Sequence, residues 1–115
     1  MAVVHLIAEL TGIPPVHLHD RALLGGLLIA AAGAAGLHAI FPPTLQSDGI
    51  RGVDGLLLLE GGHAAIHAHA TERTLLLDVL VPEPAVLSRA LDVFTRRLLP
   101  KTVSAEQLIR LATRR

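Results

Sequence analysis

Three apolar runs follow one another in the middle of the chain, and only short turn sequences separate them. The runs span residues 53–60, 63–70 and 74–80, and the turn sequences are Gly61-Gly62 and Thr71-Glu72-Arg73. Short runs of alternating or continuous apolar residues are typical of strands, and linkers this short leave room only for tight turns. The segment therefore predicts three successive antiparallel strands, and any fold of the chain has to accommodate this meander.

The residues before the meander predict a strand, a turn and a helix. Residues 3–10 mix β-branched and apolar side chains and stop at the sequence Thr-Gly-Ile-Pro-Pro, as a strand does that ends in a turn. Asp20 is a suitable N-cap for a helix over residues 21–36, whose final glycine can adopt the left-handed conformation that ends helices. Residues 37–41 then indicate a short strand. The residues that follow, 42–52, are rich in Pro, Ser, Asp and Gly and indicate an exposed loop.

The residues after the meander predict a second helix and an end that fits two structures. Residues 85–99 carry apolar side chains close to the spacing of a helix packed on one face, at Val86, Leu87, Leu91, Phe94 and Leu98. Residues 101–103 can form an edge strand, whereas Ser104 followed by Gln107 resembles a capping box that opens a helix. The sequence leaves strand and helix open for residues 101–113.

The length of the chain and the order of its elements indicate the fold. With 115 residues there is room for one hydrophobic core, so residues 1–115 are expected to form a single domain. A strand and a helix, then three strands, then a second helix favour an antiparallel sheet with both helices on one face. The predicted fold class is α+β, a two-layer α/β sandwich.

Charge and composition exclude several partners and chemistries. Ten Lys and Arg residues balance ten Asp and Glu residues, so the chain has no basic excess with which to bind nucleic acid. Without cysteine it has no disulfide, thiolate metal site or cysteine nucleophile. Residues 22–41 are uncharged over a length that can span a bilayer, but their many Ala and Gly residues and His38 favour a buried or interface helix. The N-terminal sequence lacks the features of a secretory signal, so we expect a cytoplasmic protein outside the membrane.

The middle of the chain also resembles a known family. It reads GVDG at residues 52–55, then an apolar run, GGHAAIH at residues 61–67 and LLDV at residues 76–79. This order is similar to that of the bacterial S-adenosylmethionine decarboxylase proenzyme, which carries a GVSG-like turn, an apolar strand, an E-S-H-x-S-x-H motif and a D-V-F-x-C-G motif. The resemblance runs from residue 52 to residue 78 without a gap. It implies an α/β sandwich in which two protomers join their layers, usually as a homodimer.

The same resemblance shows which functional residues differ. In the family the chain cleaves itself before the serine of E-S-H, and that serine becomes a pyruvoyl group that holds the substrate amine. The serine position is Gly62 in this chain, and glycine has no hydroxyl that could attack the preceding carbonyl. The preceding glutamate falls on Gly61, and the proton-donor cysteine falls on Pro82. We therefore expect no pyruvoyl cofactor. The lack of Trp and Tyr, which could stack on an adenine, argues against S-adenosylmethionine as the ligand.

His67 matches the processing and catalytic histidine of the family, and the serine of the GVSG turn falls on Asp54. In a strand His63, His67 and His69 share one face, and His67 and His69 are roughly 6.6 Å apart along it, so these two imidazoles could hold a divalent metal. A hairpin would place Glu60 across from His63 or nearby. A carboxylate beside an imidazole orients it as a general base. The residues predicted to perform acid/base chemistry are His67, Asp54 and Glu60.

Three functions fit these residues. The first is a member of the fold that does not process itself, binds a small, largely apolar molecule and transforms it by acid/base chemistry, as a lyase or isomerase does. The second is a catalytically silent partner that regulates an active relative. The third is decarboxylation of S-adenosylmethionine or a basic amino acid. For His63 and His69 we favour a simpler interpretation, in which water or a backbone carbonyl satisfies the ring.

Overall fold

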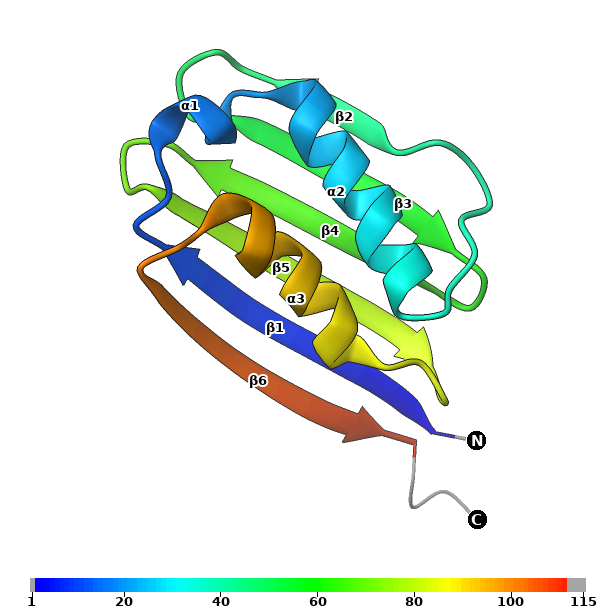
Figure 1. The fold of residues 1–115 in the computed structure, drawn as a ribbon. Coiled ribbons are helices and arrows are strands. Elements are labelled where there is room, and N and C mark those ends of the chain that lie inside the picture. Colours follow the sequence, from blue (N-terminus) through cyan, green and yellow to red (C-terminus); the bar gives the residue numbers. More distant parts are fainter. Residues whose placement is uncertain (1, 112–115) are drawn as a thin grey trace.

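The computed structural model describes residues 2–111, which form a six-stranded sheet with helices packed against one face (Figure 1). The elements in chain order are β1 (Val3–Thr11), α1 (Pro15–Leu18), α2 (Arg21–Ala34), β2 (Thr44–Ser47), β3 (Val53–Leu59), β4 (Gly62–His69), β5 (Thr74–Pro82), α3 (Leu87–Leu98) and β6 (Thr102–Arg110). The strand order is β2-β3-β4-β5-β1-β6, and all neighbouring strands are antiparallel. The predicted α+β two-layer sandwich is confirmed.

The predicted meander is β3, β4 and β5, and strict alternation decides which of its side chains are buried. One face of each strand packs against α2 and α3, with buried residues at Val53, Leu57, Leu59, Ala64, Ile66, Ala68, Leu75, Leu77, Val79 and Val81. Because alternate residues of a strand point to opposite faces, the histidines of β4 lie on the face that carries no helix. We call this uncovered side of the sheet the outer face.

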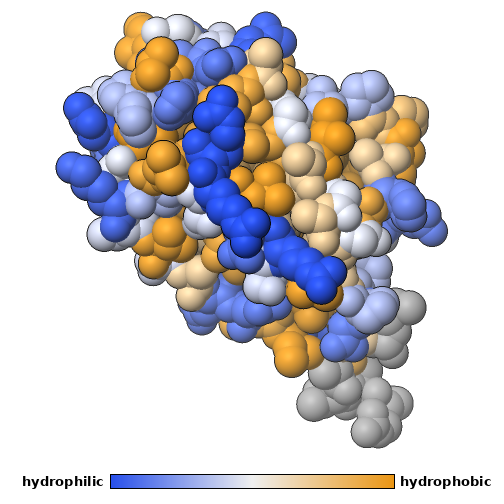
Figure 2. All heavy atoms as spheres, viewed as in Figure 1, coloured by the Kyte–Doolittle hydropathy of each residue, from blue (hydrophilic) through white to orange (hydrophobic). Residues whose placement is uncertain are grey.

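The two long helices begin and pack largely as their sequences indicate. The side chain of Asp20 accepts a hydrogen bond from the N–H of Leu23 at 3.0 Å, which caps α2, and Gly36 follows the helix with a φ of +83°. In α3, Leu87, Phe94 and Leu98 are buried. Among the described residues no helix is long and apolar enough to cross a membrane. Figure 2 shows a band of hydrophilic side chains along α3, the polar side of this amphipathic helix.

The segment between α2 and β3 differs from its prediction. Residues 37–41 form no strand and contribute only an isolated bridge between Ala39 and Leu59. The expected loop contains β2, which pairs with β3 at the edge of the sheet. Leu45 of β2 lies against α2, where a Cβ on Gly25 would come within 2.7 Å of its Cδ1 atom. The small residue in the helix therefore lets this edge strand pack closely, a tertiary contact that local composition does not reveal.

The open choice at the C-terminal end is settled in favour of a strand. β6 pairs with β1 along nine residues, from Thr102 opposite Thr11 to Arg110 opposite Val3. The capping-box alternative that begins at Ser104 is wrong, because the free edge of β1 supplies backbone partners throughout this segment. Residues 112–113 of the predicted segment lie outside the described residues. Every residue of β6 is exposed, so backbone pairing and not side-chain burial holds it in place.

The outer face carries several exposed apolar side chains. Ile7, Leu56, Leu58 and Leu76 are each between 37% and 47% exposed, and they come from β1, β3 and β5. Polar residues of the same face lie among them, including His5, Asp54, His63, His67, His69 and Asp78. The outer face is therefore mixed in character, and it contains all the histidines that the sequence singled out as candidates for chemistry.

Candidate functional site

Asp54 and His67 form a hydrogen-bonded pair on the outer face. The antiparallel register places Asp54 of β3 directly opposite His67 of β4. Their neighbours Val53 and Ile66 are fully buried, so alternation turns both polar side chains outward. The Nδ1 atom of His67 lies 2.7 Å from Oδ1 of Asp54, and their side chains are 55% and 30% exposed. The two predicted site residues are therefore in direct contact.

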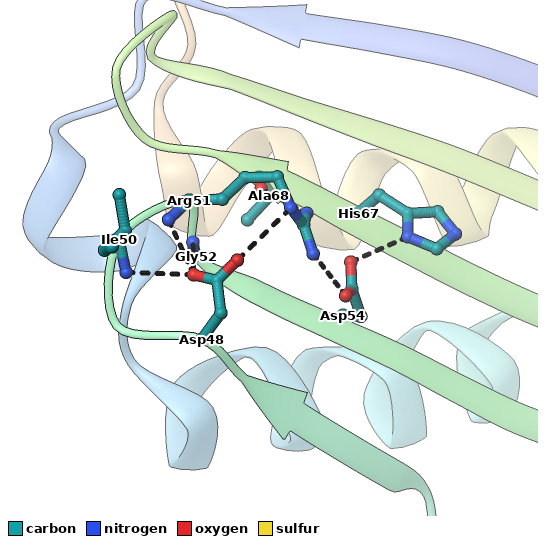
Figure 3. A network of polar contacts seen from close by, with 7 residues as sticks. All are labelled: Asp48, Ile50, Arg51, Gly52, Asp54, His67 and Ala68. Carbon is teal, nitrogen blue, oxygen red and sulfur yellow. Dashed lines mark hydrogen bonds and ion pairs between the residues drawn. The ribbon is translucent and has the colours of Figure 1, made fainter.

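Asp54 also belongs to a larger polar network, shown in Figure 3. Its second oxygen, Oδ2, accepts a hydrogen bond from Nη2 of Arg51, whose Nε atom lies 3.5 Å from Oδ2 of Asp48. The Arg51 side chain lowers the pKa of Asp54, partial burial opposes that shift, and the hydrogen bond with His67 lowers it further. Asp54 is therefore ionised at neutral pH, and an ionised carboxylate only accepts hydrogen bonds. Nδ1 of His67 is accordingly the protonated, donating nitrogen.

A hollow of about 280 Å³ adjoins the pair. It is lined by Thr44, Gln46, Asp54, Gly55, Leu56, Ala65 and His67. The lining combines small or aliphatic groups with one hydroxyl, one amide and the Asp54–His67 pair. Because Nδ1 is occupied by Asp54, the other ring nitrogen, Nε2, is the atom that can take a proton from a ligand or give one to it.

The structure does not bring Glu60 to this pair. Glu60 lies in the β3–β4 turn, and the register pairs Leu58 with His63, so Glu60 does not lie directly across from His63. The backbone N–H of Glu60 donates to the carbonyl of His38, and its side chain lines a different hollow, of about 660 Å³, at the far end of the sheet. His63 is four residues from His67 on β4, roughly 13 Å along a strand. Glu60 is part of the tight turn and does not pair with a residue of β4. Of the two predicted carboxylates, only that of Asp54 contacts His67.

The metal prediction rests on His67 and His69, and the structure assigns these residues to different hollows. His69 adjoins a separate hollow that Glu9, Glu72, Thr74 and Leu76 also line. Among residues 2–111 no group of three or more His, Asp or Glu side chains is arranged to hold a metal ion. The structure thus supplies no third protein ligand for the two histidines, and the metal site stays a prediction that the geometry does not support.

A second histidine–carboxylate pair escaped the sequence analysis. Nε2 of His5, on β1, lies 2.5 Å from Oδ1 of Asp78, on β5. The two residues are 73 positions apart in the sequence, and they meet because β1 inserts beside β5 in the sheet. Only the strand order could have revealed this pair, and that order depends on long-range pairing. The contact uses the opposite ring nitrogen from that of His67.

The positions that the family resemblance assigns to cofactor formation are closed by backbone contacts. A Cβ built on Gly62 would lie 1.8 Å from the carbonyl oxygen of Leu80 and 3.0 Å from Cα of Val81. Gly61 has a φ of +80°, which side-chain-bearing residues rarely adopt, and its Cβ would lie 3.1 Å from the Pro82 ring. The β4–β5 ladder is therefore packed around glycine at position 62, and a residue with a side chain does not fit this backbone.

Fold and site together define the class of protein: an α+β sandwich with an uncovered six-stranded antiparallel sheet that presents a histidine–carboxylate pair. The model of the S-adenosylmethionine decarboxylase family matches residues 4–111, so the chain belongs to that family. The crystal structure of the adenosylmethionine decarboxylase from Aquifex aeolicus VF5 aligns with a TM-score of 0.82 over 92% of this chain and 88% of that chain. The two sequences are 24% identical, so this likeness shows the fold alone. A search of curated proteins found no significant match.

Proposed function

We propose that this family member neither processes itself nor carries a pyruvoyl group. The support is the contact at Gly62, where the backbone of β5 occupies the space that a serine side chain needs. Glycine also lacks the hydroxyl with which self-cleavage begins. Pro82 stands where the family resemblance places a proton donor, and its ring packs near Gly61 instead. The residues around position 62 do not fit a pyruvoyl group, and no step of the proposed chemistry passes through one.

The activity that we propose is acid/base chemistry by His67 on a small, largely apolar molecule, of the lyase or isomerase type. The observation that carries it is the hydrogen bond between His67 Nδ1 and Asp54 Oδ1. This bond orients the ring and leaves Nε2 as the basic atom of a residue that lines the hollow. When Nε2 accepts a proton from the ligand, the ionised Asp54 stabilises the imidazolium that forms. In an isomerisation that proton returns to a different carbon of the ligand; in an elimination the bond to a leaving group breaks and the departing group takes the proton.

The lining of the hollow supports the ligand class. Gly55, Leu56 and Ala65 offer apolar surface, while Thr44 and Gln46 offer a hydroxyl and an amide for one or two hydrogen bonds. No lysine or arginine side chain is among the residues that line it. A small aliphatic molecule with a carbonyl or hydroxyl group, and with an acidic C–H bond near it, fits this combination.

We also propose that the protein acts as a cytoplasmic homodimer in which a second copy covers the outer face. Four large aliphatic side chains of this one face, at Ile7, Leu56, Leu58 and Leu76, are each 37–47% exposed, and apolar side chains grouped on one face are the kind of surface that a partner covers. Because His67 is more than half exposed, a second copy over the sheet would also exclude water from its hollow. The family resemblance favours the same assembly.

Proton exchange tests the proposed chemistry without knowledge of the natural ligand. The protein is incubated in D₂O with small aliphatic ketones, hydroxy acids and amides, and loss of ligand C–H signals is followed by NMR. We expect exchange with at least one compound, and we expect His67→Ala to abolish it while His69→Ala, a matched change on the same strand, preserves it. Equal exchange with the unmodified protein, His67→Ala and a blank would refute acid/base chemistry at His67.

A catalytically silent partner is the second candidate function. It is favoured by one observation: the backbone leaves no room for a side chain at position 62, whereas the outer face presents apolar side chains that a partner could cover. Such a protein would pair its outer face with that of an active family member and change that protein's activity. Mixing the two purified proteins and measuring carbon dioxide release tests this. No change in rate, together with no mixed species by native mass spectrometry, would eliminate the candidate.

A further inference from the structure

Arg51 makes three separate contacts through its guanidinium group (Figure 3). Nη2 donates to Oδ2 of Asp54, Nη1 donates to the carbonyl oxygen of Ala68 at 2.9 Å, and Nε lies 3.5 Å from Oδ2 of Asp48. The planar guanidinium has fixed donor directions, so three contacts from one plane determine its orientation. Ala68 is the residue after His67 on β4, and Arg51 therefore links the strand of Asp54 to the strand of His67.

The backbone of Arg51 is held as firmly as its side chain. One oxygen of Asp48, Oδ1, accepts hydrogen bonds from the N–H groups of Ile50 at 2.9 Å, Arg51 at 2.6 Å and Gly52 at 3.2 Å. These N–H groups lower the pKa of Asp48, with that of Ile50 making the largest contribution. The carbonyl of Arg51 accepts a hydrogen bond from the N–H of Ala70 at 2.7 Å. The turn before β3 thus fixes the place from which the guanidinium reaches Asp54.

This arrangement leaves one orientation for the Asp54 carboxylate. Its Oδ2 atom is engaged by Arg51, so Oδ1 is the atom presented to Nδ1 of His67. A carboxylate held in this way favours the His67 tautomer with the proton on Nδ1, because the opposite tautomer would place two acceptors face to face. Without the contact from Arg51, the Asp54 carboxylate could rotate about its side-chain bonds. The His67 ring could then turn toward water, since its side chain is more than half exposed.

We propose that Arg51 is a positioning residue, which holds the Asp54 carboxylate so that His67 keeps its proton on Nδ1 and presents Nε2 as the base. The role deepens the acid/base function proposed above and rests on it. Arg51 touches neither the ring of His67 nor, from the residues that line it, the hollow beside that ring. It acts through Asp54, and its effect is that Nε2 of His67, not Nδ1, is the basic ring nitrogen.

The His5–Asp78 pair provides an internal comparison. There Nε2 faces the carboxylate, so that pair favours the opposite tautomer, with the proton on Nε2. Within the described residues the ion pairs of Asp78 include His5 and no arginine. The protein therefore contains one histidine–carboxylate pair whose carboxylate contacts an arginine and one whose carboxylate does not. The two pairs favour opposite tautomers. A change at Arg51 should alter the first and leave the second unchanged.

The test is the tautomer of each histidine, read from ¹⁵N shifts and long-range ¹H–¹⁵N correlations of the full chain at alkaline pH. Spectra of His67→Ala and His5→Ala assign the two rings. We expect His67 to be mainly the Nδ1–H form and His5 mainly the Nε2–H form. In Arg51→Gln the ratio of the Nδ1–H form to the Nε2–H form of His67 should fall about fivefold, because Asp54 loses its charge-assisted contact with Arg51. The tautomer ratio of His5 should not change.

Arg51→Lys is the conservative variant, and it also serves if Arg51→Gln does not fold. Lysine keeps the charge but cannot contact Asp48, Asp54 and Ala68 from one plane, so we expect an intermediate ratio. An unchanged His67 tautomer in a folded variant would overturn the positioning role, and so would an equal shift in His5. The proposed function fails separately: if the tautomer depends on Arg51 but His67→Ala leaves ligand exchange unchanged, Arg51 is a positioning residue for a ring that performs no such chemistry.

Discussion

Replacing Gly62 by serine would restore the residue that the family uses to form its cofactor, and the structure predicts that this change will destabilise the fold. The serine Cβ would lie 1.8 Å from the Leu80 carbonyl oxygen, whereas ordinary contact begins at 3.4 Å. The obstacle is backbone on a central strand, which cannot rotate away as a side chain does. β4 and β5 would therefore have to separate by more than 1 Å in the middle of the sheet.

The cost can be worked out from two contributions. Overpacking of a well-packed site costs about 1–3 kcal/mol, and weakening one ladder hydrogen bond adds about 1 kcal/mol. We expect the free energy of unfolding to fall by about 2–4 kcal/mol, a large share of the roughly 5–15 kcal/mol that a domain has. Gly26→Ser is the matched control, because a Cβ on this exposed glycine of α2 meets nothing within 4 Å. That change should stabilise the helix by about 0.5 kcal/mol.

Urea unfolding followed by far-ultraviolet circular dichroism measures both variants, since the chain has no Trp or Tyr for fluorescence. The intact mass of each purified protein shows whether self-cleavage occurs, and we expect a single species that corresponds to the uncleaved chain. Gly62→Ser with unchanged stability would show that the contact with Leu80 is not restrictive. Two fragments produced by cleavage before residue 62 would show that this backbone still permits self-processing, and they would refute the reasoning for its loss.

Three further predictions concern the core, the polar network and the outer face. Phe94→Ala should lower the free energy of unfolding by about 3–5 kcal/mol, because Phe94 is fully buried; a loss under 1 kcal/mol in urea unfolding would contradict this. The pKa of Asp54 is lower in the folded protein, so its stabilising contribution is present above the unfolded pKa of about 3.9 and disappears as pH falls through the folded value. Asp54→Asn should therefore be slightly less stable than the unmodified chain at pH 7 and nearly equal to it near pH 2, which urea titrations at both pH values will show. Leu58→Asp, on the outer face, should convert the proposed homodimer to monomer in sedimentation experiments, whereas Ile29→Asp, at an exposed position of α2, should not.

The parts of the fold that sequence analysis predicted are those that local chemistry determines. Asp20 predicts the start of α2 because a helix N-terminus needs an acceptor for its free N–H groups. The Asp20 side chain accepts such a bond from the N–H of Leu23. The period of two in β4 assigns Ala64 and Ile66 to the core and His67 to the outer face without knowledge of any other strand. These features depend on residues within one helical turn or one strand.

The parts that the sequence did not reveal depend on long-range pairing. β6 has no buried side chain and becomes a strand because β1 offers a free edge. The His5–Asp78 pair exists because β1 lies between β5 and β6. Glu60 was expected near the site because the hairpin register was unknown, and a shift of the turn by one residue decides which side chains face each other. Strand order and register are set by the whole sheet, so no local pattern could have supplied them.

The polar network around His67 is difficult to explain as a device for stability. Its members lie on the outer face or in the turn before β3, and His67 is more exposed than buried, so contacts of this kind contribute little to folding. Yet Asp54 is held by Arg51, and Arg51 is held in turn by Asp48 and by the carbonyl of Ala68. A network that contributes little to folding but fixes the tautomer and direction of one ring is what a site for proton transfer requires. Glycine at position 62 leaves no room for a side chain in the same protein, and the proposed function accordingly assigns the chemistry to the side chain of His67.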